Sequence, residues 1–83
     1  MSQLPLYERV ALRSDMHQHG LKTGDVATLV DYAPHPGSGQ EGYVLEVFNA
    51  VGESIAVVTV SATDVEPLHA DEVLAVRHLA QAG

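Results

Sequence analysis

The sequence predicts a mainly β protein, built as a small barrel of five short antiparallel strands with a short C-terminal helix. The chain has 83 residues, enough for one domain that buries only about 60% of its unfolded surface. Segments rich in β-branched residues alternate with turn residues at the spacing of a small all-β barrel. Good helix formers follow Pro67, so residues 1–68 are assigned to the barrel and residues 69–83 to a helix packed on the barrel or on a partner.

The first expected strand is residues 8–13, ERVALR, in which Val10 and Leu12 lie on one face. This alternation is typical of a strand with one buried face. Residues 14–25 follow as a polar loop, and its two glycines are available for positive φ angles. The segment therefore predicts a half-buried strand and a bend before the next one.

Three further strands are separated by strong turn signals. Residues 33–42 hold two prolines and three glycines, which cannot form a regular element, and Gly52 suits a hairpin bend. The register near Ala27–Leu29 stays open, because a bulge there would exchange inward and outward residues. The strands expected between these breaks are residues 26–32, 43–50 and 54–60.

The last strand and the helix are expected on either side of Leu68. Residues 61–68 predict a tight turn and a short strand, which Pro67 confines to an edge or an end of the sheet. Residues 69–83 have acids near the start, a base near the end and a final glycine, as helices prefer. The apolar face of this helix would hold Val73, Val76, Leu79 and Ala80.

The charge balance is strongly acidic, with 11 acids, four bases and a formal net charge of −7. Between Thr23 and Val76 there are nine carboxylates and no Lys or Arg. A nucleic-acid binder needs cations to neutralise phosphates, and an anionic membrane surface attracts them, so we expect neither nucleic acid nor membrane as a partner. An acidic surface favours a basic protein partner, although it also serves solubility alone.

Cysteine usage and targeting signals bear on the compartment. The chain has no Cys, which excludes disulfides and thiolate metal sites and is compatible with a reducing cytoplasm. No charged segment followed by an apolar one opens the sequence, so we expect no secretory signal. The longest apolar run, Ile55–Val60, is too short to cross a bilayer. We therefore expect a cytoplasmic protein.

Four short motifs, HGLKTGD, GYVLEVF, ESIAVVTV and DVEPL, occur in this order within roughly residues 4–68. In their order and spacing the chain resembles an uncharacterised bacterial family, domain of unknown function 4926. The resemblance implies a five-stranded SH3-like barrel and partner binding, including accessory-subunit, immunity-like or antitoxin-like roles. It implies no catalytic residue, because the family has no agreed activity. Two positions depart from the family pattern: Ala27 stands where Gly is favoured, and Val44 where a charged residue is favoured.

The pair His17 and His19 is the strongest candidate for a chemical site. In an extended segment, residues i and i+2 point to the same side, so the two imidazoles would share one metal ion. Asp15 or His35 is available as a third ligand if the loops converge. Structural zinc needs four ligands and catalytic zinc usually three, and nothing in the sequence fixes the remainder. A small metal-binding protein is therefore the alternative function, and a solvated loop is the simpler interpretation.

No catalytic arrangement stands out, and we expect neither an enzyme nor a cofactor. Residues 22–25 lack the long glycine-rich spacing of a phosphate loop, and a strand follows them instead of a helix. A turn in which Asp25 accepts bonds from nearby backbone N–H groups is the better interpretation. The serines are not embedded in a nucleophile motif such as Gly-x-Ser-x-Gly.

Apolar residues occupy both faces of two expected strands, residues 43–48 and 55–60. A barrel with one packed face and one wet face would show cleaner alternation. We therefore predict that Val44, Phe48 and Val58 belong to a patch covered either by the C-terminal helix or by another chain. Together with the acidic charge, this favours a non-enzymatic protein-interaction module that binds a protein partner or self-associates.

Overall fold

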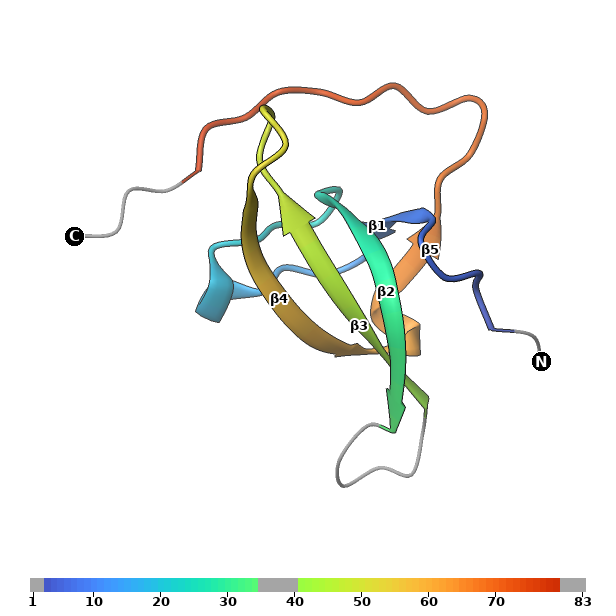
Figure 1. Cartoon of the computed structure of the whole chain (residues 1–83). Helices are drawn as coiled ribbons and strands as arrows, with labels where there is room; N and C mark the ends of the chain where they lie inside the picture. Colours follow the sequence, from blue (N-terminus) through green and yellow to red (C-terminus); the bar gives the residue numbers. More distant parts are fainter. Residues whose placement is uncertain (1–2, 35–40, 80–83) are drawn as a thin grey trace.

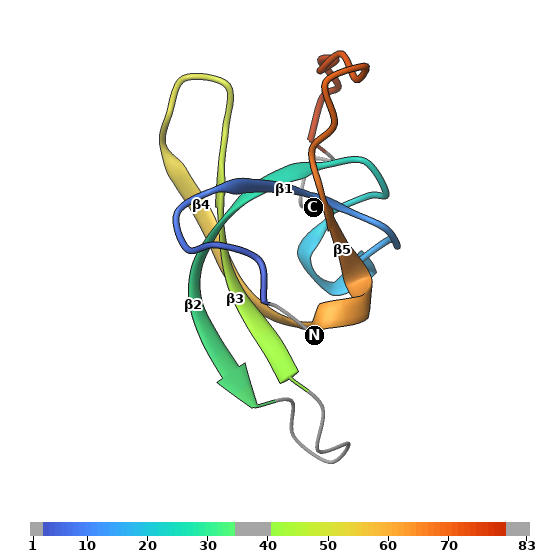
Figure 2. The same ribbon diagram turned by 90° about the vertical axis from the view of Figure 1, so that its right-hand side faces the viewer.

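The computed structural model describes residues 3–34 and 41–79 and consists of five antiparallel strands in one curved sheet (Figure 1). The strand order is β4-β3-β2-β1-β5, so the last strand returns to pair with the first. Figure 2 shows the curvature: β2, β3 and β4 lie on one side of the molecule, β5 lies on the other, and β1 runs across between them. The elements are β1 (Arg9–Leu12), η1 (His17–His19), β2 (Val26–Pro34), β3 (Glu41–Phe48), β4 (Ser54–Ser61), η2 (Ala62–Asp64) and β5 (Val65–Pro67), where η marks a single 3₁₀ turn.

The expected mainly β class and the five antiparallel strands are confirmed. The sheet is not closed, because β4 and β5 are its two outer strands and no ladder joins them. β2 and β3 extend into the Pro/Gly-rich segment from both sides, and residues 35–40 of that segment lie outside the described residues. A complete barrel is therefore not shown.

The turn between β4 and β5 is built from local polar side chains. The Ser61 hydroxyl accepts a bond from the Thr63 N–H, and the Asp64 carboxylate accepts one from the Ser61 N–H. This reciprocal capping satisfies backbone donors that would otherwise lose their partners at the start of the turn. It ends β4 and directs the chain into β5, where Val65 pairs with Leu12 of β1.

The C-terminal helix predicted over residues 69–83 is wrong for its described part, residues 69–79, which form no helix. An isolated helix this short is marginal in water unless an apolar face packs against something. Val73 and Val76, expected on the apolar face of this helix, are 92% and 88% exposed and therefore do not pack against the sheet. Instead, residues 68–79, here called the tail, leave β5 and run past the same end of the molecule as the β3–β4 turn, apart from the hairpin itself (Figures 1 and 2).

The core lies on the concave side of the sheet. On β3, Tyr43, Leu45 and Val47 are buried while the residues between them are more exposed, as the two-residue period of a strand requires. Leu29 of β2 and Leu45 are directly paired and fully buried. Full burial of one such aliphatic side chain contributes about 1.5–3 kcal/mol. The remaining core residues are Val10, Leu12, Leu21, Ala27, Val58, Val60 and Val65.

A bulge in β2 decides which side chains enter this core. Leu29 pairs with Leu45, but the next paired residue is Asp31 opposite Val44, so Val30 is an extra residue. Without it, simple alternation from Leu29 would turn Asp31 inward. The bulge keeps Asp31 exposed and lets Tyr32 pack against the core instead. The sequence left open whether a bulge lies near Ala27–Leu29. The structure places the bulge at Val30, directly after Leu29.

Candidate functional site

The outer face of the β3–β4 hairpin carries exposed apolar side chains, here called the outer apolar patch. Its members are Val44, Phe48, Ile55 and Val57. Phe48, Ile55 and Val57 are 41%, 40% and 61% exposed, and Val44 is half-buried. Strand alternation places them opposite the core, because their neighbours Leu45 and Val58 point inward. An apolar cluster on a solvated sheet face is the kind of feature that marks an interaction surface.

Two of the three patch residues predicted from sequence, Val44 and Phe48, lie on this face. The inclusion of Val58 is wrong, because Val58 is only 3% exposed and belongs to the core. Both parities of β4 are apolar, so the sequence could not tell its inner from its outer set. The pairing of Leu45 with Val58 settles the parity, and it puts Ile55 and Val57 outside.

The hairpin turn that holds the patch in place is fixed by one amide side chain. The Asn49 Oδ1 atom accepts bonds from the N–H groups of Val51 (3.1 Å) and Glu53 (2.9 Å). Its Nδ2 atom donates to the Glu53 carboxylate at 2.8 Å. Gly52 has a φ of 87°, a left-handed conformation that a residue with a Cβ atom adopts at a cost. The turn therefore orients Phe48 and Ile55 on a rigid hairpin.

Two acidic residues, Glu46 and Glu53, lie within the patch and at one end of it. The half-buried Glu46 lies between Val44 and Phe48 on the same face and pairs directly with Val57. Glu53 closes the hairpin at one end of the patch. Since residues 23–76 contain no Lys or Arg, this surface combines apolar contact area with negative charge.

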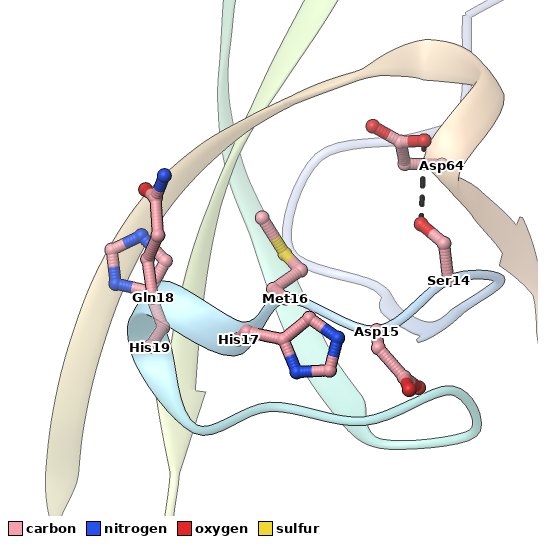
Figure 3. A pocket seen from close by; sticks show the side chains of 7 residues that line it. All are labelled: Ser14, Asp15, Met16, His17, Gln18, His19 and Asp64. Carbon is pink, nitrogen blue, oxygen red and sulfur yellow. Dashed lines mark hydrogen bonds between the residues drawn. The ribbon is translucent and has the colours of Figure 1, made fainter.

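A shallow depression of about 340 Å³ lies between η1 and η2 (Figure 3). Its lining residues are Ser14, Asp15, Met16, His17, Gln18, His19 and Asp64. The Ser14 hydroxyl and the Asp64 carboxylate lie 3.5 Å apart across it, longer than the usual O–H···O hydrogen bond of about 2.5–3.0 Å. Most of the lining is exposed, so the depression offers little exclusion of water to a ligand or a reaction.

His17 and His19 both lie on η1 instead of on an extended segment. A 3₁₀ turn has three residues per turn, so residues i and i+2 point about 120° apart. Figure 3 shows this divergence: the His17 ring points toward Asp15, whereas the His19 ring lies beside Gln18. The same-side geometry assumed for a shared metal is therefore not found. In residues 3–34 and 41–79, no group of three or more His, Cys, Asp or Glu side chains comes together as a metal site.

The third ligand considered for that metal, Asp15, is engaged in a structural role. Its Oδ1 atom accepts bonds from the Thr23 N–H at 2.8 Å and from the Thr23 hydroxyl at 2.9 Å. These two bonds hold the pKa of Asp15 below its ordinary value. The carboxylate thus ties the two ends of the β1–β2 loop together. His35, the other ligand considered, lies outside the described residues.

The expected turn at residues 22–25 is confirmed. The Lys22 N–H donates to the Asp25 carboxylate at 2.8 Å, the Asp25 N–H donates to the Lys22 carbonyl at 3.0 Å, and β2 begins at the next residue. The same carboxylate accepts bonds from Arg77 of the tail, through Nε at 2.9 Å and through Nη2. The bond from Arg77 and, with a smaller effect, the backbone bond from Lys22 lower the pKa of Asp25, against a desolvation that raises it.

Comparison with known proteins gives one match. A family model described as "Domain of unknown function (DUF4926)" matches residues 6–67. No curated protein and no solved structure matches the chain. Among the residues that the structure describes, no helix has the length and apolar character needed to span a membrane.

Proposed function

This chain belongs to the DUF4926 family, whose model covers most of its length, and we propose that it is a non-enzymatic protein-interaction module. The observation that carries the proposal is the outer apolar patch. Phe48 of β3 and Ile55 and Val57 of β4 are exposed on two paired strands, where the aromatic side chain can fill a partner's pocket and the two aliphatic side chains add apolar contact area. Aromatic residues are enriched at the centres of protein interfaces.

The charge around the patch indicates the chemistry of the partner. Glu46 within the patch and Glu53 at its end are negative, and the whole chain carries −7. A partner with a basic rim around an apolar pocket would be attracted at long range and held by apolar contact. Accessory subunits and antitoxin-like or immunity-like proteins bind in this manner, and we place this chain among them. Association with such a partner weakens as salt screens the charges.

The roles that the acidic side chains have in the described residues support the non-enzymatic part of the proposal. The depression beside η1 is shallow, and Asp15 and Asp25 are both committed to turns and tethers in the described structure. A catalytic site usually shields a titratable group in a cleft, where burial and neighbours tune its pKa. A small metal-binding protein using His17 and His19 remains the alternative, with weaker support because the two rings diverge.

We also propose that the complete domain is an SH3-like barrel and that the protein works in the cytoplasm. The strand order supports the first point, because β5 returns to β1 after the single turn η2, as the last strand of such a small barrel does. The strong curvature of the sheet in Figure 2 is of the same kind. The absence of cysteine supports the second point, since it matches a reducing compartment.

Affinity capture from native lysate, read by mass spectrometry, tests the interaction with matched variants. Phe48→Asp places a charge in the outer apolar patch, and Tyr7→Asp makes a similar change at an aromatic that is 74% exposed elsewhere. We expect a stoichiometric partner with the wild type and with Tyr7→Asp, and its loss with Phe48→Asp. Circular dichroism checks that both variants fold. Recovery of no partner, or retention by Phe48→Asp, contradicts the proposal.

A further inference from the structure

We propose that β4 pairs edge to edge, antiparallel, with β4 of a second copy of this chain, joining the two sheets across a two-fold axis at Val57. This inference goes beyond the proposed function, because it needs the free backbone edge of β4 and no partner bound on the outer apolar patch, although it shares Ile55 and Val57 with that patch. It concerns the two outer strands of the sheet, β4 and β5, and their capacity to pair with a further strand. One of these strands is blocked against further pairing and the other is open.

The two edges of the sheet differ in length and composition. β5 has three residues, includes the charged Glu66 and ends at Pro67, which has no N–H to donate. β4 has eight residues, Ser54–Ser61, with no charged residue and no proline among them. Natural sheets protect their edges with short strands, charges, prolines, bulges or covering segments. β5 has three of these protections, whereas within residues 3–34 and 41–79 the only one found on β4 is a register shift at its first residues.

The backbone of β4 is available on its outer side. From Gly42↔Ser61 to Val47↔Ala56 its ladder with β3 is continuous. In an antiparallel ladder every second residue of an edge strand points its N–H and C=O groups away from its partner. Within residues 3–34 and 41–79, no other segment forms a backbone hydrogen bond with Ile55–Val60. This row of donors and acceptors is a template for one more strand.

The sequence of β4 suits pairing with itself. Directly opposite residues in an antiparallel pair point to the same face, so an axis at Val57 sets Val57 against its symmetry mate and Ile55 against Thr59. All three are β-branched, and all three are exposed. The nearest acid before the strand, Glu53, comes opposite Ser61, so no like charges meet. Val57 is also the most exposed apolar residue of the strand at 61%, so an axis there buries the most apolar area.

The effect of salt on binding distinguishes a second copy of this chain, which has the same negative charge, from the basic partner proposed above. Two copies each carrying −7 repel at long range, while their paired edges are neutral. Self-association should therefore strengthen as salt is added, because screening removes the repulsion but not the backbone bonds. Binding of a basic protein should weaken under the same change.

Sedimentation equilibrium on the full chain, at increasing concentration and in low and high salt, tests the dimer. The informative variants are Val57→Lys and Val57→Glu, which set like charges opposite each other in a homodimer but opposite charges in a mixed dimer. Val73→Lys is the matched control, because Val73 is an exposed valine of the tail. Phe48→Lys charges the same outer face without touching the edge strand. Circular dichroism establishes that each variant folds.

We expect a wild-type dimer that tightens with salt, monomers for Val57→Lys and Val57→Glu alone, and a dimer again in their equimolar mixture. Val73→Lys should dimerise like the wild type. A wild type that stays monomeric, a dimeric Val57→Lys, or a mixture that stays monomeric overturns the proposal. Loss of the dimer in Phe48→Lys but not in Val57→Lys overturns it as well, because it assigns the contact to the outer face.

Discussion

The Arg77 guanidinium and the Asp25 carboxylate, 52 residues apart in the chain, form a bidentate ion pair that fastens the tail to the start of β2. Arg77 also donates to the Gly20 carbonyl at 3.1 Å, and Asp25 is held from the other side by the Lys22 N–H. Bidentate bonds between a guanidinium and a carboxylate are among the stronger polar contacts in proteins. Asp25 is mostly buried, with 19% of its side chain exposed, so solvent screens this pair less than a fully exposed one.

Replacing Arg77 with Ala should release the tail without unfolding the sheet. The tail contributes no residue to the hydrophobic core, and Arg77 donates hydrogen bonds to Asp25 and to the Gly20 carbonyl in the body of the protein. We expect the ¹⁵N heteronuclear NOE of residues 72–79 to fall while the values of β2 and β3 stay unchanged. Arg77→Lys, which keeps the charge but not the planar pair of donors, should give an intermediate decrease. Unchanged NOE values in Arg77→Ala would show that other contacts hold the tail.

Acid should weaken the fold through Asp25 and Asp15. Both carboxyls have a folded pKa lowered from 3.8, so their stabilising effect is complete above about pH 4 and is lost as the pH falls through the lowered values. We expect urea unfolding of Asp25→Asn to show a lower free energy than wild type at pH 7. The difference in the free energy of unfolding between wild type and Asp25→Asn should narrow below pH 4, where the wild-type carboxyl becomes protonated. If the gap stays constant from pH 7 to pH 3, the ion pair does not couple to folding.

A double-mutant cycle separates the ion pair from the other roles of Asp25. Arg77→Ala removes one partner, Asp25→Ala the other, and the double variant removes both. Because Lys22 also donates to Asp25, the carboxylate variant should lose more stability than the arginine variant. Strict additivity of the two single effects would contradict a direct energetic contact between the residues.

The strands could be predicted from sequence because their signal is local. Alternation in segments such as GYVLEVF repeats every two residues, and the turn residues beside them set the strand ends within a few positions. The turn at Lys22–Asp25 was predicted for the same reason, since the carboxylate and the N–H group that it caps are three residues apart. Local chemistry decides such features without knowledge of the fold.

Features set by long-range pairing could not be predicted. The tail has helix-forming residues, but whether a helix forms depends on an apolar surface to receive it, and Arg77 binds Asp25 instead. The bulge at Val30 appears only when β2 is aligned with β3. The same alignment places Val58 inside and Val57 outside. The divergence of His17 and His19 depends on η1, for which the polar loop sequence gave no signal.

Truncating Leu45 to Ala should strongly destabilise the domain. Leu45 is fully buried between Leu29 and Val58, its partners on the two neighbouring strands. A cavity of this kind costs about 2–5 kcal/mol, a large share of the stability of so small a domain. Val57→Ala, on the exposed face of the adjacent strand, should change the free energy of unfolding of the monomer by at most about 0.5 kcal/mol. Chemical denaturation of both variants measures the contrast, and equal losses would contradict the assignment of inner and outer faces.

Titration with zinc, nickel and copper should show no tight, saturable binding at His17 and His19. The rings diverge on η1, and Asp15 is held by Thr23 rather than aimed at them. Two imidazoles also fall short of the ligands that a zinc site needs. Isothermal calorimetry of the wild type and of His17→Ala/His19→Ala is the measurement. Stoichiometric binding that disappears in the double variant would revive the metal-binding alternative.

Replacing Tyr7 with Gly should stabilise the fold. Tyr7 has a φ of 69°, the left-handed region that costs a residue with a Cβ atom about 1–2 kcal/mol. Backbone bonds on both sides enforce it, because the Tyr7 N–H donates to the Leu29 carbonyl and the Leu29 N–H donates to the Glu8 carbonyl. The Tyr7 side chain is 74% exposed, so its removal sacrifices few contacts.

The greater freedom of Gly in the unfolded chain offsets part of this gain. We therefore expect Tyr7→Gly to raise the free energy of unfolding by about 0.5–1 kcal/mol, measured by urea denaturation. Tyr7→Ala is the matched control, because it removes the ring but keeps the Cβ atom and therefore the strained backbone. Tyr7→Gly should have a higher free energy of unfolding than Tyr7→Ala, because Gly adopts the left-handed conformation without the strain that a Cβ atom causes. A Tyr7→Ala variant as stable as Tyr7→Gly would show that the backbone at this position carries no strain.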